Sequence, residues 1–285
     1  MPDFKKKRQK EGFITSSPEP VSKRPSLNAS PVACSLSSRP SFLKSTEVNA
    51  GEDFFVSYHF EREADLMPRE YYSKHPKITP SARAMLVAWM MECCVQLKAH
   101  RSTLHLCVYL LDRFMSLTSL PITNEDTFHS IGAACILIAC KYEEIEHPYI
   151  TWFDALDLGK WEVRVLMTLR WHLNFYTSCS WLEEAMSMSA VNKVLARSLV
   201  DCCLMDPRLV GFAPSQIALS IIDLLTAQIN KENASPFVEV TGVQEILLDI
   251  QQAYPFLFIF PDGEAKGTAH ILDEIDLLME VFVHS

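Results

Sequence analysis

The sequence predicts an all-α protein. Apolar residues recur at helical spacing through most of the chain after residue 50, and one such stripe is Leu86, Met90, Cys93 and Leu97. The chain holds only 8 glycines in 285 residues, and few segments alternate between apolar and polar residues as a half-buried strand would. The length allows one or two compact domains besides a tail.

Residues 1–50 are expected to form a disordered regulatory tail, because Ser, Pro, Lys and Arg dominate them. They carry 9 Lys or Arg and 4 Asp or Glu residues, whereas the remainder carries 17 and 31. The remainder is therefore acidic, with a formal charge of −14, which argues against nucleic-acid binding by this part. No run of about 20 apolar residues predicts a membrane span.

An N-terminal helix and a linker are expected over residues 51–80. The pattern over 54–72 fits an amphipathic helix that Pro68 would limit or kink. Residues 75–80 contain two prolines, which disfavour helix in the residues before them.

A first helical block is expected over residues 81–176, with Ser81 capping its first helix. Five helices are predicted in it, over residues 82–97, 102–119, 124–142, 149–156 and 160–169. The third begins at a cap formed by Thr123 or Asn124. It is apolar over Ile131–Cys140 and rich in small residues, so it is expected to be surrounded by other helices.

A second helical block is expected over residues 177–285. Its predicted helices cover residues 179–190, 192–205, 214–229, 243–254 and 269–282. The apolar run at 217–222 echoes 131–140, as an internal duplication would. Residues 255–268 alternate phenylalanine with other apolar residues and could form a short extended segment.

Two charged residues stand in otherwise apolar helical surroundings, Arg83 on one predicted helix and Asp112 on the next. A buried charge is costly unless it is paired. The sequence therefore predicts a structural ion pair between Arg83 and Asp112.

Three segments in this order resemble the cyclin box. They are Arg83-Ala84-Met85-Leu86-Val87-Ala88-Trp89, Leu111-Asp112-Arg113-Phe114 and Ala139-Cys140-Lys141-Tyr142-Glu143-Glu144. The resemblance is densest over residues 54–176 and is to cyclins of the A, B and E types. Arg170-Trp171-His172-Leu173, followed by Trp181-Leu182, leans towards the E type.

This resemblance implies two tandem five-helix cyclin folds. It also implies a non-enzymatic regulatory subunit, which binds and activates a cyclin-dependent Ser/Thr protein kinase and helps select its substrates in cell-cycle control. Such a chain needs no cofactor, because the kinase supplies the ATP and magnesium chemistry. The alternatives are a cyclin-like adaptor that does not activate a kinase and a transcription-associated cyclin-fold scaffold, with a helical enzyme ranked last.

The resemblance implies that Lys141 and Glu162 hold the mobile helix of the kinase and the loop before it. An apolar collar is expected around this pair, formed by Ile138, Tyr142, Leu166 and Leu173. The residues alone allow a simpler interpretation, in which the pair is a surface salt bridge worth roughly 0–1 kcal/mol and the collar is ordinary core packing.

A substrate-docking face is the second implied site. In many cyclins the face that corresponds to Met85, Leu86, Trp89 and Glu92 docks Arg-x-Leu peptides of substrate and inhibitor proteins. This chain departs from the usual pattern at Ala82, Ala88 and His129, so an altered groove is expected. The alternative is a helix buried on both sides.

Short motifs complete the list of candidates. The basic run Lys5, Lys6, Lys7 and Arg8 resembles a nuclear import signal and favours the nucleus, with the cytoplasm as the alternative; such a run can also merely keep a chain soluble. Arg24 and Leu27 fit a minimal destruction box, and Lys231, Glu232 and Asn233 spell a KEN degron, which would recruit ubiquitin ligase machinery. Ser17-Pro18 and Ser30-Pro31 fit proline-directed kinases.

The 9 cysteines include no C-x-x-C pair, so no zinc or dithiol site is predicted. Most fall within predicted helices and are expected to be buried, reduced thiols. No catalytic motif is present: the sequence contains no phosphate-binding loop, no nucleophile elbow and no H-E-x-x-H.

Overall fold

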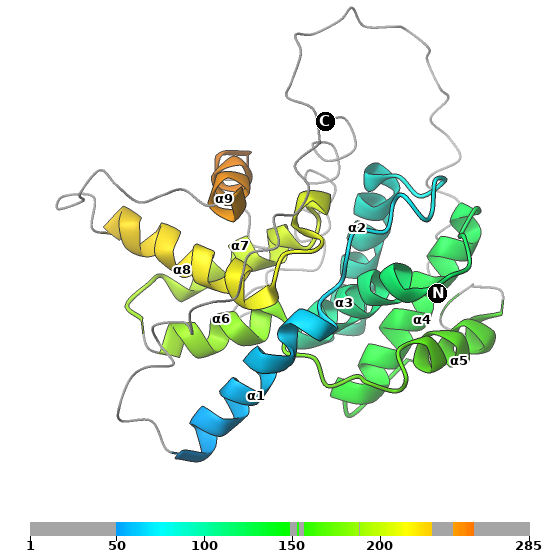
Figure 1. The fold of residues 1–285 in the computed structure, drawn as a ribbon, viewed down its shortest axis with the longest axis horizontal. Coiled ribbons are helices and arrows are strands. Elements are labelled where there is room, and N and C mark those ends of the chain that lie inside the picture. The colour runs from blue at the N-terminus through cyan, green and yellow to red at the C-terminus, as the bar shows by residue number, and fades with distance from the viewer. Residues whose placement is uncertain (1–49, 149–152, 154–156, 188, 230–241, 254–285) are drawn as a thin grey trace, which may run out of the picture. The chain divides into compact units, whose positions relative to one another are not determined.

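The computed structural model describes residues 50–148, 153, 157–187, 189–229 and 242–253 (Figure 1). Over these residues the regular secondary structure is helical and contains no strand, which confirms the predicted all-α class. The helices are α1 (Ala50–Leu66), α2 (Pro80–Leu97), α3 (Arg101–Leu117), α4 (Glu125–Glu143), α5 (Leu158–Thr168), α6 (Ser178–Ser187), α7 (Lys193–Cys203), α8 (Pro214–Ile229) and α9 (Gly242–Ala253), with a 3₁₀ turn at Pro207–Leu209. No helix in the described part of the chain is both long and apolar enough to span a membrane.

The helices α2 and α4 each begin after a residue whose side chain caps the helix, but the cap of α2 is not the predicted residue. Ser81 is not the cap of α2, because the helix already begins at Pro80. Thr79 is the cap instead: its side chain accepts a hydrogen bond from the Ala82 backbone N–H, and Pro80 fits the first helical position because it has no N–H to satisfy. Asn124 caps α4 by accepting from the Asp126 backbone N–H. The tail, the last predicted helix and the segment 255–268 lie outside the described residues, as does nearly all of 149–156.

Helix α4 forms the centre of the first block. All residues from Ile131 to Cys140 are buried, and α4 contacts α2, α3 and α5. Figure 1 shows α4 lying beside α5. Gly132 allows a close approach of α2, since a Cβ built there would lie 2.8 Å from Leu86 Cδ1. The absence of a polar face along this part of α4 is therefore explained by neighbours around the helix.

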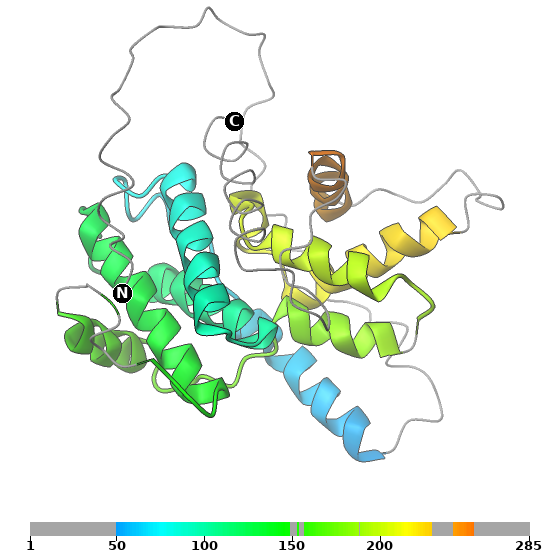
Figure 2. The same cartoon turned by 180° about the vertical axis from the view of Figure 1, so that it is seen from behind.

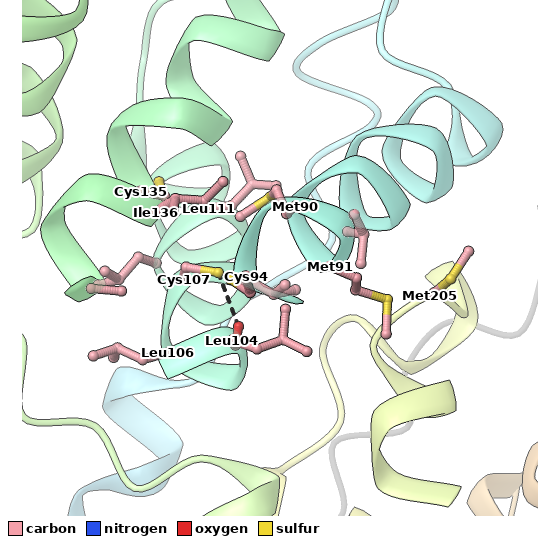
Figure 3. Packing of buried hydrophobic residues seen from close by; sticks show 14 of the residues in the cluster. Met90, Met91, Cys94, Leu104, Leu106, Cys107, Leu111, Cys135, Ile136 and Met205 are labelled. Atoms are coloured by element: carbon pink, nitrogen blue, oxygen red, sulfur yellow. Dashed lines mark hydrogen bonds between the residues drawn. The ribbon is translucent and has the colours of Figure 1, made fainter. Parts of the chain in front are cut away.

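Sulfur-containing side chains fill much of this core. Figure 3 shows Cys94 of α2 next to Cys107 of α3, and Met90 of α2 and Cys135 of α4 belong to the same cluster of buried side chains. The thiol of Cys107 donates to the Leu104 carbonyl at 3.0 Å. The 8 cysteines in the described ranges are all buried, and none of them forms a disulfide, as predicted. Burial raises the pKa of the Cys140 thiol to about 12, so this thiol stays protonated and unreactive.

In the second block, α6 and α9 pack against α8 (Figure 2). Trp181 and Leu182 of α6 are buried. Polar contacts join this block to the earlier helices. Asp201 of α7 is buried and accepts from Arg101 Nε and His105 Nε2 of α3, each at 3.0 Å. Glu63 of α1 accepts from the Ser215 backbone N–H at 2.7 Å and from its hydroxyl at 2.5 Å, at the start of α8. These contacts tie α3 to α7 and α1 to the start of α8.

Candidate functional site

The predicted ion pair between Arg83 and Asp112 is present and lies in the protein interior. Arg83 Nε donates to Asp112 Oδ1 at 2.8 Å, and Nη2 donates to Oδ2 at 2.7 Å. Arg83 Nη1 also donates to the Leu204 carbonyl at 2.9 Å, while the Tyr71 hydroxyl donates to Asp112 Oδ1 at 2.9 Å. The pair thus joins α2, α3, the segment before α2 and the end of α7.

The electrostatics of this cluster keep the Arg83 guanidinium charged. Burial alone would lower the pKa of Arg83, but the charge of Asp112 and its hydrogen bonds outweigh burial and raise that pKa well above its usual value. Burial and the Asp112 charge also raise the pKa of Tyr71 well above its usual value, so its hydroxyl keeps its proton. Because each nitrogen of the Arg83 guanidinium and both carboxylate oxygens of Asp112 have a partner inside the protein, the cluster is suited to a structural role.

Lys141 and Glu162 form a second ion pair, at the surface. Lys141 lies in the last turn of α4 and Glu162 in the first half of α5. Lys141 Nζ is 2.5 Å from Glu162 Oε1, and the two side chains are 38% and 15% exposed. The fold therefore brings together two residues that lie 21 positions apart in the sequence, and it leaves the ammonium group accessible.

The predicted apolar collar divides into exposed and buried members. Tyr142 is 49% exposed beside Lys141, and Leu173 is half-buried. Ile138 and Leu166 are only 2% and 8% exposed, because they belong to the core between α4 and α5. These two residues support the surface from below, and most of the area that they would offer to a partner is already covered.

Other exposed apolar residues occupy the surface that the collar was expected to form. Val163 and Met167 lie one turn apart on α5 and are 59% and 63% exposed. Ile145 is fully exposed just after α4, and Trp171 is 63% exposed. Of these residues, Ile145 and Met167 were not predicted as part of the surface, because apolar residues at helical spacing do not show which of them a neighbouring helix covers.

The backbone at Trp171 has an unusual conformation. Arg170 and Trp171 have φ angles of 53° and 60°, in the left-handed region that residues with a side chain rarely adopt. Trp171, Tyr142 and Leu173 line one pocket together with residues of α1, among them Tyr58 and Arg62. The guanidinium of Arg62 lies 5.3 Å from the centre of the Tyr58 ring and donates to its hydroxyl at 2.5 Å. An aromatic pocket with a cationic rim thus adjoins the Lys141–Glu162 pair.

The predicted docking face on α2 is only partly exposed. Met85 is 41% exposed, and Trp89 and Glu92 are half-buried. The Trp89 ring lies 3.9 Å from the ring of the exposed His129 on α4, measured between ring centres. Leu86 departs from the prediction: it is buried because its side chain fills the space above Gly132. Ala82 and Ala88, two of the positions where the chain departs from the usual cyclin pattern, are buried as well.

The remaining candidate residues lie outside the described part of the chain. They are the basic run Lys5, Lys6, Lys7 and Arg8, the destruction-box residues Arg24 and Leu27, and the KEN residues Lys231, Glu232 and Asn233.

Comparison with known proteins identifies the fold around the Lys141–Glu162 pair. Residues 55–174 match the family model of the cyclin N-terminal domain. This part of the chain is a cyclin N-terminal domain. The resemblance seen in the sequence is thereby confirmed, and the matched range contains the Arg83–Asp112 pair, the Lys141–Glu162 pair and the docking face.

Cyclins of several types are similar to this chain. The G1/S-specific cyclin-E of Caenorhabditis briggsae is 36% identical over 133 residues, which are 44% of this chain and 26% of that protein. The G2/mitotic-specific cyclin-B of Dictyostelium discoideum is 29% identical over 184 residues, 60% of this chain and 41% of that protein. The G1/S-specific cyclin-E1 of Danio rerio is 30% identical over 171 residues, 52% of this chain and 41% of that protein. The matches thus span about a quarter to two-fifths of the lengths of these relatives.

A solved structure shares the fold. The viral cyclin from herpesvirus saimiri superposes with a TM-score of 0.50 at 18% sequence identity, and the match covers 81% of this chain and 96% of that chain. Because the match extends well beyond residues 55–174, the second helical block also follows the cyclin architecture.

Proposed function

We propose that this protein is the regulatory subunit of a cyclin-dependent Ser/Thr protein kinase, which it binds and activates. The observation that carries the proposal is the partly exposed Lys141–Glu162 pair, which joins α4 to α5, together with the exposed apolar side chains on and just after these two helices. A charged pair that served only the fold would not need exposed apolar residues such as Met167 and Trp171 around it. Exposed apolar patches of this kind mark protein interaction sites.

The chemistry of the pair suits a partner's helix end or loop. The Lys141 ammonium group offers three donors, which can bind free backbone carbonyls, and the Glu162 carboxylate can accept from backbone N–H groups. Val163 and Met167 lie one helical turn apart on α5 and can contact apolar side chains of the same partner segment. On binding, the ion pair loses water, which strengthens the interaction of its charges with the partner.

Activation would follow from a preference for one kinase conformation. In protein kinases, phosphoryl transfer needs an ion pair between a strand lysine and a glutamate on a mobile helix, and the position of that helix controls activity. A surface that binds this helix only in its inward position shifts the kinase towards the active state. The shift is limited by the difference between the affinities of the cyclin for the two states.

We further propose that α2 contributes to substrate choice. Glu92 supplies a carboxylate that can bind a guanidinium group, while Met85 and Trp89 provide apolar area beside it. Because His129 covers part of the Trp89 ring and Leu86 is buried, the face offers less apolar area than its sequence predicted. Weak selection by Arg-x-Leu motifs is therefore expected.

A histone kinase assay with a panel of purified cyclin-dependent kinases tests the proposal. The wild-type protein is compared with Lys141→Ala/Glu162→Ala and with a matched control, Arg197→Ala/Glu183→Ala. The control removes another exposed ion pair, in which Arg197 Nε lies 2.6 Å from Glu183 Oε1, on α7 and α6. Activation by the wild type and the control, but not by the Lys141/Glu162 variant, would support the proposal. Tight binding without activation would support the adaptor alternative.

A further inference from the structure

We propose that Glu144 is a positioning residue of the kinase-binding surface and that it acts through the end of α4, which carries Lys141 and Tyr142. This inference rests on the proposed function for the identity of the partner. The structural role of Glu144, which is to hold this end of α4 in place, rests on the contacts of Glu144 alone.

Glu144 follows directly on the last turn of α4, and its carboxylate reaches the start of α3. Its backbone N–H donates to the Cys140 carbonyl at 2.9 Å and closes α4. Glu144 Oε1 accepts from the His100 backbone N–H at 2.7 Å and from the Thr103 hydroxyl at 2.5 Å. Oε2 accepts from His100 Nδ1 at 2.8 Å. Only 11% of the Glu144 side chain is exposed, so water competes weakly for these bonds.

Through these contacts Glu144, which directly follows α4, caps the start of α3. The N-cap residue of α3, His100, makes no side-chain cap hydrogen bond. In a capping box, a Glu or Gln at the third helical position accepts from the N-cap backbone N–H. Here that position is Thr103, and the acceptor is Glu144, which lies 44 residues from His100 in the sequence. A negative charge at this helix end is also favourable, because it opposes the positive end of the helix dipole.

The electrostatic environment favours the ionised carboxylate. Burial by itself would raise the pKa of Glu144, but the hydrogen bonds from Thr103 and His100 outweigh burial and lower it. At neutral pH the carboxylate can therefore only accept hydrogen bonds, which fits its three donors.

Glu144 affects the kinase-binding surface because Lys141 and Tyr142 lie at the helix end that it holds. Both belong to the last turn of α4, and a terminal turn frays readily because its carbonyls lack partners within the helix. Lys141 pairs with Glu162, and such a partly exposed ion pair contributes too little free energy to fix a helix end. Glu144 ties the same turn to the firmly packed helix α3. Loss of this tie would leave Lys141 and Tyr142 on a mobile helix end, which a partner would have to order on binding.

Two measurements on the full chain test the inference, with Glu144→Ala as the variant and Asn192→Ala as the control. Asn192 caps α7 by accepting from the Val194 and Leu195 backbone N–H groups at 3.1 and 3.2 Å, so the control also removes one helix cap. In amide hydrogen exchange, Glu144→Ala is expected to raise the rates at the end of α4 and the start of α3 at least ten-fold relative to the control. Unchanged rates at the end of α4 would overturn the positioning role, whether or not a kinase binds.

The second measurement is kinase affinity by calorimetry, in the wild-type and Lys141→Ala backgrounds. Glu144→Ala is expected to weaken binding at least ten-fold in the wild-type background and clearly less in the Lys141→Ala background, while Asn192→Ala leaves affinity unchanged. Equal losses in both backgrounds would mean that Glu144 does not act through Lys141 and would overturn the inference. Failure of the wild type to bind any kinase of the panel would refute the proposed function instead, and the exchange rates would still decide the role of Glu144.

Discussion

Two ion pairs of the same domain each join a basic side chain to a carboxylate, but one pair is buried and the other lies at the surface. Arg83 and Asp112 meet through two hydrogen bonds in the interior, whereas Lys141 and Glu162 meet through a single contact at the surface. The buried pair has further partners within the chain, Tyr71 and the Leu204 carbonyl. The surface pair keeps an accessible ammonium group. Charge and spacing in the sequence are therefore not enough to assign a role, and burial decides between a structural and a binding function.

The largest expected effect is the loss of the buried pair. Asp112→Ala leaves the Arg83 guanidinium uncompensated in the interior and should lower the free energy of unfolding by about 3–5 kcal/mol. Urea denaturation followed by circular dichroism measures this change. The double variant Arg83→Met/Asp112→Leu should be more stable than Asp112→Ala, because no charge is stranded. A loss below about 1 kcal/mol in Asp112→Ala would contradict the structural role.

Two neighbouring residues of α5 extend the comparison from charges to apolar side chains. Leu166 is 8% exposed and Met167 is 63% exposed. Leu166→Ala should cost about 2–5 kcal/mol of stability because it opens a cavity in the core. Met167→Ala should stay within about 0.5 kcal/mol of the wild type, since it removes a surface side chain, but it should weaken kinase binding. Thermal unfolding and calorimetric titration of both variants would separate the two roles, and equal stability losses would contradict the assignment.

The surface pair should contribute little to the fold. Lys141→Ala/Glu162→Ala is expected to change the free energy of unfolding by about 0–1 kcal/mol, as for other exposed ion pairs. Urea denaturation beside the Arg197→Ala/Glu183→Ala control measures this. A loss comparable to that of Asp112→Ala would show that the surface pair is structural after all.

Glu63 offers a further test of the comparison, because it is a buried carboxylate that Ser215 holds and that pairs with no cation among the described residues. Burial raises the pKa of Glu63, although the hydrogen bonds from Ser215 oppose the rise. The folded state therefore holds this proton more tightly than the unfolded state does, whose Glu pKa is about 4.3. The contribution of Glu63 to stability is fully present below that value and is lost as the pH rises through the raised folded pKa.

Glu63→Gln should remove this pH dependence, since the amide does not titrate and its oxygen can still accept from the Ser215 backbone N–H. The stability of the wild type relative to Glu63→Gln should fall as the pH rises above the unfolded-state pKa value of about 4.3. Urea midpoints across this range measure the difference. A constant difference would mean that burial does not raise the pKa of Glu63.

The sequence predicts the helices and the buried pair because both follow from local patterns. Arg83 and Asp112 stand out as charges within apolar stripes, and the apolar run of α4 indicates a helix with neighbours around it. The docking face and the collar are harder to predict, because a helical stripe does not reveal which apolar residues a neighbouring helix covers. Leu86 is buried only because α4 has Gly132 opposite it.

Contacts between distant segments lie beyond what local patterns reveal. Neither the bonds of Glu144 to His100 and Thr103 nor that of Glu63 to Ser215 has a signature in the sequence, since the partners lie 41 to 152 residues apart. The prediction of Ser81 as the cap of α2 is wrong for a more local reason. Thr79 and Ser81 are both good capping residues, and the preference of Pro80 for the first helical position decides between them.

The affinity of the protein for a cyclin-dependent kinase, measured by calorimetry for the wild type, Lys141→Ala/Glu162→Ala and Arg197→Ala/Glu183→Ala, tests the central claim most directly. All three proteins should unfold at similar urea concentrations. The wild type and the Arg197/Glu183 control should bind with the same affinity, and the Lys141/Glu162 variant should bind at least ten-fold more weakly. Equal binding by all three would contradict the claim that the surface pair where α4 meets α5 recognises the kinase.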